Sequence, residues 1–548
     1  MTAVFDFADR LTDEWFALSP VGATLSGEPA EGWDDWSPAG AAHAAALAAE
    51  RLAQLDGLPS ESKWDDLAIA IMQDELSLVV ELFEARSHLR ALNSIWSPVQ
   101  MLRDTYDYMD LGSEEGWRRA IDRLRTTPEA LERYRRSLQL GMEEGVMAAR
   151  RQALAAATEL RAHTADSGYF ATLPARVVEM GFAQLVGEVA SAVSDARAGL
   201  AGFAEWLESE YAPTAPTDDG VGAEEYQLNI RRYLRTTKLD PAATYDWGWS
   251  EVNRLWDRMD EVATSVVEGG DIAEAFRILK TDPARAAHGT EAFADFISRR
   301  LTDAQQRLAG SHFEIPEPLE RLDVLVSPPG GSIGAEYRSP SDDFSRPGAV
   351  VYHPGNKTVF PLYDEVSTAY HEGFPGHHLQ SAMQVYLGDD LSRFHRLVVW
   401  SSGYGEGWAL YAEHLMGELG FYDKPDYELG LLANQMLRAC RVVIDIGNHL
   451  GLDVPENRFG IGAWDFDSSV KMLEEVAFLA SDYARSEVTR YLGWPAQAIS
   501  YKVGEQVILD LRDEAGTQDW YSDKEFHRRV VGHGPVGLDM LRDLVLAS

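Results

Sequence analysis

The sequence predicts a mainly α-helical protein with a small antiparallel β element. Three observations predict this fold class. Apolar residues recur at intervals of three and four along most of the chain, which is the helical period. Short runs rich in β-branched residues occur in one region only, residues 320–362. The chain has 548 residues, which is too long for one ordinary domain but within reach of a two-lobed body.

Helical stripes are clearest in two segments. Apolar residues advance by three and four from Val252 to Val266, in "EVNRLWDRMDEVATSVV". The same spacing runs from Leu131 to Met142, in "ALERYRRSLQLGMEEG". Stripes of this kind are typical of helix faces that pack into a core, and we assign them no other role.

A composition break divides the chain. Tyr211–Tyr226, "YAPTAPTDDGVGAEEY", combines prolines, glycines and acidic residues, which is typical of a loop between lobes. We therefore expect an N-terminal helical lobe over residues 1–212 and a catalytic lobe over residues 213–548, interdigitating in one body.

The β element is predicted from two runs bounded by proline and glycine. They are "ERLDVLVSPPGG" (Glu320–Gly331) and "GAVVYHPGNKTVFPL" (Gly348–Leu362), with the turn-rich "SPSDDFSRPG" between them. The second run leads directly into "YDEVSTAYHEGFPGHH". From about Ser367 the chain returns to helix.

Composition excludes several classes of protein. The net charge of −39, from 88 acidic and 49 basic residues, opposes binding to nucleic acid or to anionic lipid. Cys440 is the only cysteine, which suits a reducing cytosol and excludes a cysteine-rich metal site. No signal peptide and no uninterrupted apolar stretch of about 18 residues is visible. We expect a cytoplasmic protein without a membrane or nucleic-acid partner.

The stretch "AYHEGFPGHHLQ" is the main candidate for a catalytic site. His371 and Glu372 begin like the zinc peptidase motif HExxH, in which two histidines four residues apart share a helix face and the glutamate is the general base. Pro375 stands where the second histidine belongs. A bulge at this proline could bring His377 to the metal, with His378 as the alternative ligand. The competing interpretation is a loop with exposed histidines.

A third ligand is predicted in "SSGYGEGWALYAEHL". Glu406 lies at the start of an expected helix and completes a set of two imidazoles and one carboxylate. Glu413, one heptad later, is either a rival ligand or an acceptor for a ligand histidine. A helix N-terminal acid favoured by the helix dipole is the alternative explanation for Glu406.

These residues carry a resemblance to a known family. The motif "HEGFPGHHLQ" matches HExxPGHHxQ, the hallmark of a large bacterial family, domain of unknown function 885. The resemblance covers most of the chain and includes "RPGAVVY", "GEGWALYAE", "RYLGWPAQAISYKVGEQ" and "FHRRVVGHGPVGLDML". One departure is Ala496, where the family usually has glycine.

That family in turn is remotely similar to the helical zinc peptidases, the group of angiotensin-converting enzyme, the oligopeptidases and the Taq-type carboxypeptidase. The resemblance implies helical lobes around a deep cleft, one zinc ion per chain, and a substrate strand just before the His-Glu helix. "GAVVYHPGNKTVF", with Tyr352, would be that strand and would bind the peptide backbone by strand addition.

The same resemblance implies further roles. Tyr501 is expected to donate to the oxyanion, or else to be a core tyrosine. Arg490 is a candidate for binding a substrate carboxylate, against a structural ion pair. His533 is a candidate donor to the oxyanion or to the substrate, against a plain loop histidine.

The predicted function is zinc-dependent hydrolysis of peptide or related amide bonds in short peptides, with Glu372 as general base. Mn, Co or Fe would also suit the ligand set. The alternatives are a serine hydrolase that uses Ser332 of "GGSIG", and a non-catalytic helical protein that binds metal or peptide. Residue preference, endo- or exo-cleavage and oligomeric state are not predicted.

Overall fold

Helices make up most of the chain in this computed structural model, which describes residues 2–327 and 334–547. The prediction of a mainly α protein is confirmed. The chain forms two units. The first contains the residues up to Gly220 together with Ser392–Val398 and Leu492–Trp494, and the second contains the remainder.

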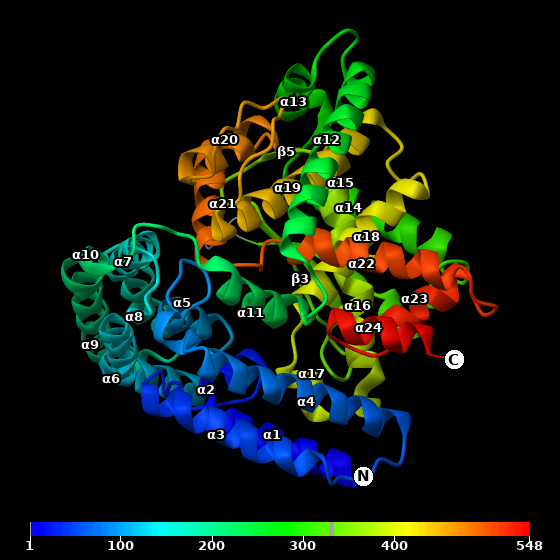
Figure 1. Cartoon of the computed structure of the whole chain (residues 1–548). Helices are drawn as coiled ribbons and strands as arrows, with labels where there is room; N and C mark the ends of the chain where they lie inside the picture. Colours follow the sequence, from blue (N-terminus) through cyan, green and yellow to red (C-terminus); the bar gives the residue numbers. More distant parts are fainter. Residues whose placement is uncertain (1, 328–333, 548) are drawn as a thin grey trace. The chain divides into compact units, whose positions relative to one another are not determined.

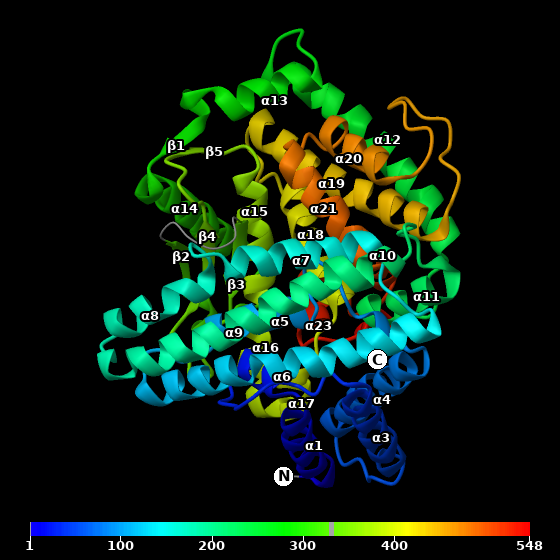
Figure 2. The same ribbon diagram turned by 90° about the vertical axis from the view of Figure 1, so that its left-hand side faces the viewer.

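The first unit is helical throughout its described residues. Three long helices form its centre, and Figure 2 shows them side by side: α9 packs against α6, to which it runs parallel, and against α7, to which it runs antiparallel. Its elements are α1 (Ala3–Leu18), α2 (Pro20–Leu25), α3 (Pro38–Leu55), α4 (Lys63–Glu84), η1 (Ser87–Arg90), α5 (Pro98–Asp104), η2 (Thr105–Asp107), α6 (Glu114–Glu144), α7 (Arg150–Thr164), α8 (Tyr169–Glu179), η3 (Ala183–Leu185), α9 (Val186–Trp206), the π-turn η4 (Leu207–Tyr211), α10 (Ala212–Thr214) and α17 (Arg393–Val398).

Capping and small residues explain the longest of these helices. The Ser113 hydroxyl accepts the Gly116 amide at the start of α6, and Gly145 ends the helix in the left-handed region. Gly199 of α9 faces Pro128 of α6, where an added Cβ would lie 3.1 Å from the proline ring. The two helices therefore approach closely over a shared apolar core.

The second unit carries every predicted site residue that the structure describes. Its helices are α11 (Gly222–Leu234), α12 (Pro241–Val266), α13 (Ile272–Thr281), η5 (Pro283–Arg285), α14 (Thr290–Leu308), η6 (Glu317–Glu320), α15 (Glu365–Glu372), α16 (His377–Leu387), η7 (Gly388–Asp390), α18 (Ser402–Glu418), α19 (Pro425–Leu450), α20 (Phe466–Glu475), α21 (Ser481–Gly493), α22 (Ser500–Ala515), α23 (Asp523–Val531) and α24 (Leu538–Leu546). The predicted stripe from Val252 to Val266 is the buried face of α12, which packs on α19.

The β element is larger than predicted and only partly antiparallel. Three strands are ordered β2 (Leu322–Val326), β4 (Gly348–His353), β3 (Gly334–Arg338). β4 pairs antiparallel with β3 but parallel with β2. A separate antiparallel pair joins β1 (Ala286–His288) to β5 (Val359–Pro361). No strand was predicted at residues 334–338; they form one by pairing with an edge of β4.

The sheet corrects the expected role of "GAVVYHPGNKTVF". Its first half is β4, which lies between two strands, so its backbone groups are already paired within the sheet. Strand addition needs an unpaired edge. The predicted binding of a peptide along this strand is therefore wrong for β4.

The backbone conformation of Ala496 explains why the pattern that the sequence resembles has glycine at this position. Its φ is 63°, in the left-handed region that favours glycine, and its amide donates to the Asp445 carboxylate over 2.9 Å. The chain thus keeps the glycine conformation with an alanine.

Within residues 2–327 and 334–547, no helix has the length and apolar composition that crossing a bilayer requires.

Candidate metal centre

The histidine motif is two helices separated by a break. α15 ends at Glu372, so His371 lies in its last turn, and α16 begins at His377. The connection Gly373–Gly376 contains a cis Phe374–Pro375 peptide bond. The predicted two-residue bulge is therefore a full interruption, because Pro375 has no amide hydrogen to continue the helix.

Close backbone contacts hold the break together. The Gly376 amide donates to the Tyr370 carbonyl over 3.0 Å. A Cβ at Gly376 would lie 2.0 Å from the His371 carbonyl oxygen, so only glycine fits here. From α18, the buried Trp408 indole N–H donates to the carbonyls of Pro375 and Gly376, at 3.0 and 3.1 Å. The connection is thereby tied to the helix that supplies the third ligand.

His371, His377 and Glu406 converge. Glu406 Oε2 lies 3.5 Å from His371 Nε2 and 3.6 Å from His377 Nε2, and the three ligand atoms all lie within 4.8 Å of one another. The edge of a tetrahedron around zinc with bonds of about 2.1 Å is about 3.4 Å. The donor set and its spacing therefore fit one zinc-sized ion.

Glu413 contacts His371 from the other side of the ring. Its Oε1 lies 2.7 Å from His371 Nδ1, and its Oε2 accepts from the Ser367 hydroxyl. The Glu413 side chain is fully buried. Of the two roles predicted for this residue, the geometry matches the acceptor: it orients the ring so that Nε2 faces Glu406.

Electrostatics tie these groups to one another. Burial opposes a charge on His371, but the hydrogen-bonded Glu406 and Glu413 outweigh it and raise the pKa of the imidazole to about 10. Burial opposes a charge on Glu406 too, and the two histidines overcome it and lower the pKa of that carboxyl. The site is thus built to hold positive charge among carboxylates.

Glu372 is adjacent to the cluster and differs from the other carboxylates. No hydrogen bond to a described residue engages it, and burial raises its pKa, although His371 and His377 act in the opposite direction. A carboxylate with a raised pKa is suited to accept a proton and return it.

Tyr501 reaches the cluster because two helices touch at glycines. A Cβ on Gly407 of α18 would lie 2.6 Å from Gly504 of α22, so the two backbones pack directly; Figure 1 shows these helices side by side. The Tyr501 ring stacks on His371 at 6.5 Å and 18°. Burial and Glu406 raise the pKa of Tyr501 to about 12, so its hydroxyl stays protonated and can donate.

His378 lies outside the cluster. Its Nε2 donates to the Leu319 carbonyl over 2.8 Å, and its Nδ1 accepts from the Tyr337 hydroxyl over 3.0 Å. Burial lowers its pKa to about 4. Both ring nitrogens of a neutral imidazole are thus engaged, which corrects the alternative that made His378 the second ligand.

The remaining predicted residues are placed as follows. Arg490 pairs with Glu487 through two 3.0 Å hydrogen bonds, the structural role that was its alternative. Tyr352 is buried on β4 near Glu372, and its hydroxyl bonds to no residue of the described ranges. His533 Nδ1 lies 2.8 Å from the Arg529 carbonyl after α23. Ser332 lies outside the described residues, and the chain beyond it enters β3 rather than a helix.

Two arginines near the cluster were not predicted. Arg438 and Arg441 of α19 place their guanidinium carbons 5.9 and 4.7 Å from the Tyr501 ring centroid. Their sequence context, "LRACRV", is that of ordinary helix, so no local pattern distinguishes them from surface arginines.

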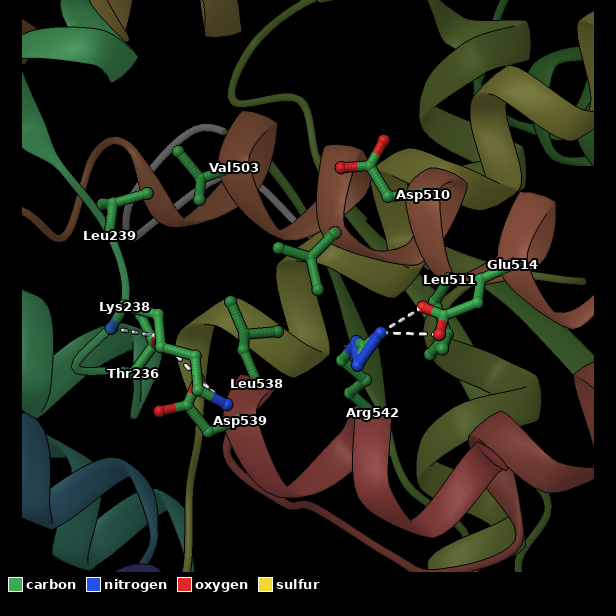
Figure 3. A pocket seen from close by; sticks show the side chains of 11 residues that line it. Thr236, Lys238, Leu239, Val503, Asp510, Leu511, Glu514, Leu538, Asp539 and Arg542 are labelled. Atoms are coloured by element: carbon green, nitrogen blue, oxygen red, sulfur yellow. Dashed lines mark hydrogen bonds and ion pairs between the residues drawn. The ribbon is translucent and has the colours of Figure 1, made fainter. Parts of the chain in front are cut away.

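A pocket of about 240 Å³ lies apart from these residues, between α22, α24 and the segment at Lys238 (Figure 3). Apolar side chains line it, with the ion pairs Arg542–Glu514 and Lys238–Asp539 beside them. None of the predicted site residues is among its lining residues.

Fold and site together define a mainly α-helical protein with a candidate mononuclear metal centre. The chain belongs to the family described as "Bacterial protein of unknown function (DUF885)", which matches residues 20–545. No curated protein matches the chain.

Two solved structures share the fold. One is a "putative lipoprotein from Colwellia psychrerythraea", with a TM-score of 0.85, 22% identity and 99% and 98% of the two chains covered. The other is a "putative lipoprotein of unknown function from Shewanella oneidensis", with a TM-score of 0.75, 15% identity and both chains covered completely.

Proposed function

We propose that this protein is a metal-dependent hydrolase that cleaves peptide or related amide bonds in short peptides. The observation that carries the proposal is the convergence of His371, His377 and Glu406, with Glu372 next to the first ligand. Two imidazoles and one carboxylate are a ligand set of catalytic zinc sites, which leave a position for water.

The side chains divide the work. His371, His377 and Glu406 would hold the ion. A bound zinc ion supplies Lewis acidity, which polarises a carbonyl and lowers the pKa of water. Glu372 accepts the proton of the attacking water and returns it to the leaving amine. Tyr501 donates a hydrogen bond to the developing oxyanion.

Other features support the proposal. The site's ligand types are those of the helical zinc peptidases, the group that the sequence resembles. The free carboxylate of Glu372 favours catalysis over a structural ion, because a structural site closes its coordination and needs no adjacent base. Mn, Co or Fe would also suit the ligands. A cytoplasmic location stays a prediction, and the two structural neighbours are named as lipoproteins.

Metal content tests the first half of the proposal. Wild type and His371→Ala are purified without chelator, and bound metals are measured by plasma mass spectrometry. We expect about one zinc per chain in wild type and little in the variant. A wild-type protein that holds no divalent metal, even after zinc is added and the excess removed, would contradict the proposal.

Turnover tests the second half. Glu372→Gln should keep the metal and lose hydrolysis of a short-peptide pool by about 10²- to 10⁴-fold, the usual contribution of a general base. Near wild-type activity in that variant would remove the role of Glu372. Ser332→Ala is the matched test of the serine alternative: if it abolishes activity while a chelator has no effect, the protein is a serine hydrolase.

A further inference from the structure

Three arginines lie near the candidate metal centre, and two of them share one carboxylate. Arg441 donates to Glu487 over 2.7 Å, and Arg490 donates to the same carboxylate twice. Arg438 forms no ion pair with any described residue; its Nη1 donates only to the Asn434 carbonyl. The group therefore holds more positive than negative charge inside a chain whose net charge is −39.

Hydrogen-bonding capacity in this group is unused. The Nη1 atom of Arg441 and the Nε atom of Arg438 are buried and have no hydrogen-bond partner among the residues that the structure describes. Arg441 is only 5% exposed, so its guanidinium gains little from water. Asp445 also lies near Arg490; its Oδ2 accepts from the Tyr226 hydroxyl and from the Ala496 amide, and its Oδ1 has no hydrogen bond to a described residue. A buried guanidinium with a free donor is costly unless an anion completes it.

We infer that Arg438 and Arg441 bind a carboxylate group of the substrate. The inference rests on the proposed function, since it takes the substrate to be a peptide. The carboxylate is the C-terminus of the peptide or an acidic side chain, which present the same chemistry to a guanidinium. Arg490, the arginine that the sequence indicated for this role, is occupied by Glu487 and by Gln497.

The spacing limits where cleavage occurs. Tyr501 is close to both groups, with its ring 6.5 Å from the His371 ring and 5.9 and 4.7 Å from the two guanidinium carbons. An extended peptide covers about 3.3–3.6 Å per residue. At most about three residues therefore separate the cleaved bond from the carboxylate. Arg438 and Tyr501 are half-buried, so a peptide can reach them.

Equilibrium dialysis tests the inference without turnover. The Glu372→Gln protein, in metal-free and zinc-loaded form, is dialysed against a pool of N-acetylated random tripeptides with free C-termini. A matched pool carries C-terminal amides, and bound peptides are quantified by mass spectrometry. We expect the acid pool to bind about 10- to 100-fold more tightly, the effect of a charged hydrogen bond pair.

Variants assign the preference to a residue. Introduced into the Glu372→Gln protein, Arg438→Gln should remove the preference for the acid pool. Arg438→Lys should keep part of that preference, because lysine retains the charge but loses the two-pronged geometry. Arg458→Gln is the control, since Arg458 is an exposed arginine of the same unit paired with Asp257. Thermal unfolding checks folding; Arg438→Gln breaks no ion pair and should change the Tm little.

The outcomes are separable. Equal binding of acid and amide pools, a preference that survives Arg438→Gln, or no binding of either pool overturns the inference. Selective retention of amides that contain Asp or Glu supports it and identifies a side-chain carboxylate. If wild type hydrolyses both pools at equal rates, the peptidase stands and the inference fails. If the acid pool binds more tightly but wild type hydrolyses neither pool, the inference about the carboxylate stands and the proposed peptidase activity fails.

Discussion

Glu413→Gln is the sharpest test of how the metal centre is oriented. The substitution keeps the shape of a fully buried side chain and the acceptor oxygen 2.7 Å from His371 Nδ1. It removes only the charge. The amide can still meet the Ser367 hydroxyl, which rotates to accept, so the fold should be retained.

The expected loss follows from the strength of that contact. A hydrogen bond to a charged acceptor contributes about 1.5–3 kcal/mol and a neutral one about 0.5–1.5 kcal/mol, so the exchange alone costs about 1–1.5 kcal/mol. A neutral acceptor also leaves His371 less basic toward the ion. Loss of such an outer carboxylate typically weakens metal binding about 10- to 100-fold. We expect about tenfold, or about 1.4 kcal/mol.

The assay is a competition titration of metal-free protein with zinc and a chromogenic chelator. Glu406→Gln should lose far more affinity, because it removes a ligand. Glu291→Gln is the control, since Glu291 is an exposed residue of α14 in the same unit. A Glu413→Gln protein within twofold of wild type would refute the reasoning, and a loss equal to that of Glu406→Gln would make Glu413 a ligand.

Three further predictions concern stability. Gly504→Ala should lower the Tm by several degrees and weaken zinc binding, because its Cβ would lie 2.1 Å from the Gly403 carbonyl oxygen. Ala496→Gly should raise the free energy of unfolding by up to about 1 kcal/mol, by relieving the left-handed conformation. Burial lowers the pKa of His527 to about 4, so below its unfolded pKa of about 6.5 the unfolded chain binds the extra proton and stability falls. Measured by urea unfolding, the free energy of unfolding should therefore fall by about 2 kcal/mol less in His527→Gln than in wild type between pH 7 and pH 5.

The sequence predicted the helices better than the strands. Helical stripes repeat over many residues, and the one ending at Val266 is the buried face of α12. The strand at Gly334–Arg338 was missed because its residues, "GAEYR", show no β-branched run. Parallel pairing of β2 with β4 was missed as well, because it depends on the path of the chain between them and not on either segment alone.

At the site, residue types were predictable and contacts were not. Two histidines and a later glutamate indicated a ligand set, which the structure brings together. The choice between His377 and His378 depended on the dihedral angles of Gly373 to Gly376, which no periodic pattern describes. Arg490 was a candidate for binding a substrate carboxylate because it lies in a matching motif, yet its pairing with Glu487 is visible only in three dimensions.

The break between α15 and α16 has a consequence for recognising sites of this kind. In HExxH the helical repeat dictates how far apart the ligands stand, so a text pattern can find them. Here the distance between the ligands is set by a four-residue connection, which is held by the Gly376 amide and by the hydrogen bonds of the Trp408 indole. Ligand spacing becomes a property of a turn, and a search tuned to a four-residue interval passes over it. A search for such a turn together with an indole that donates to its carbonyls would find such centres. The turn and the tryptophan could also be grafted together onto other helical scaffolds.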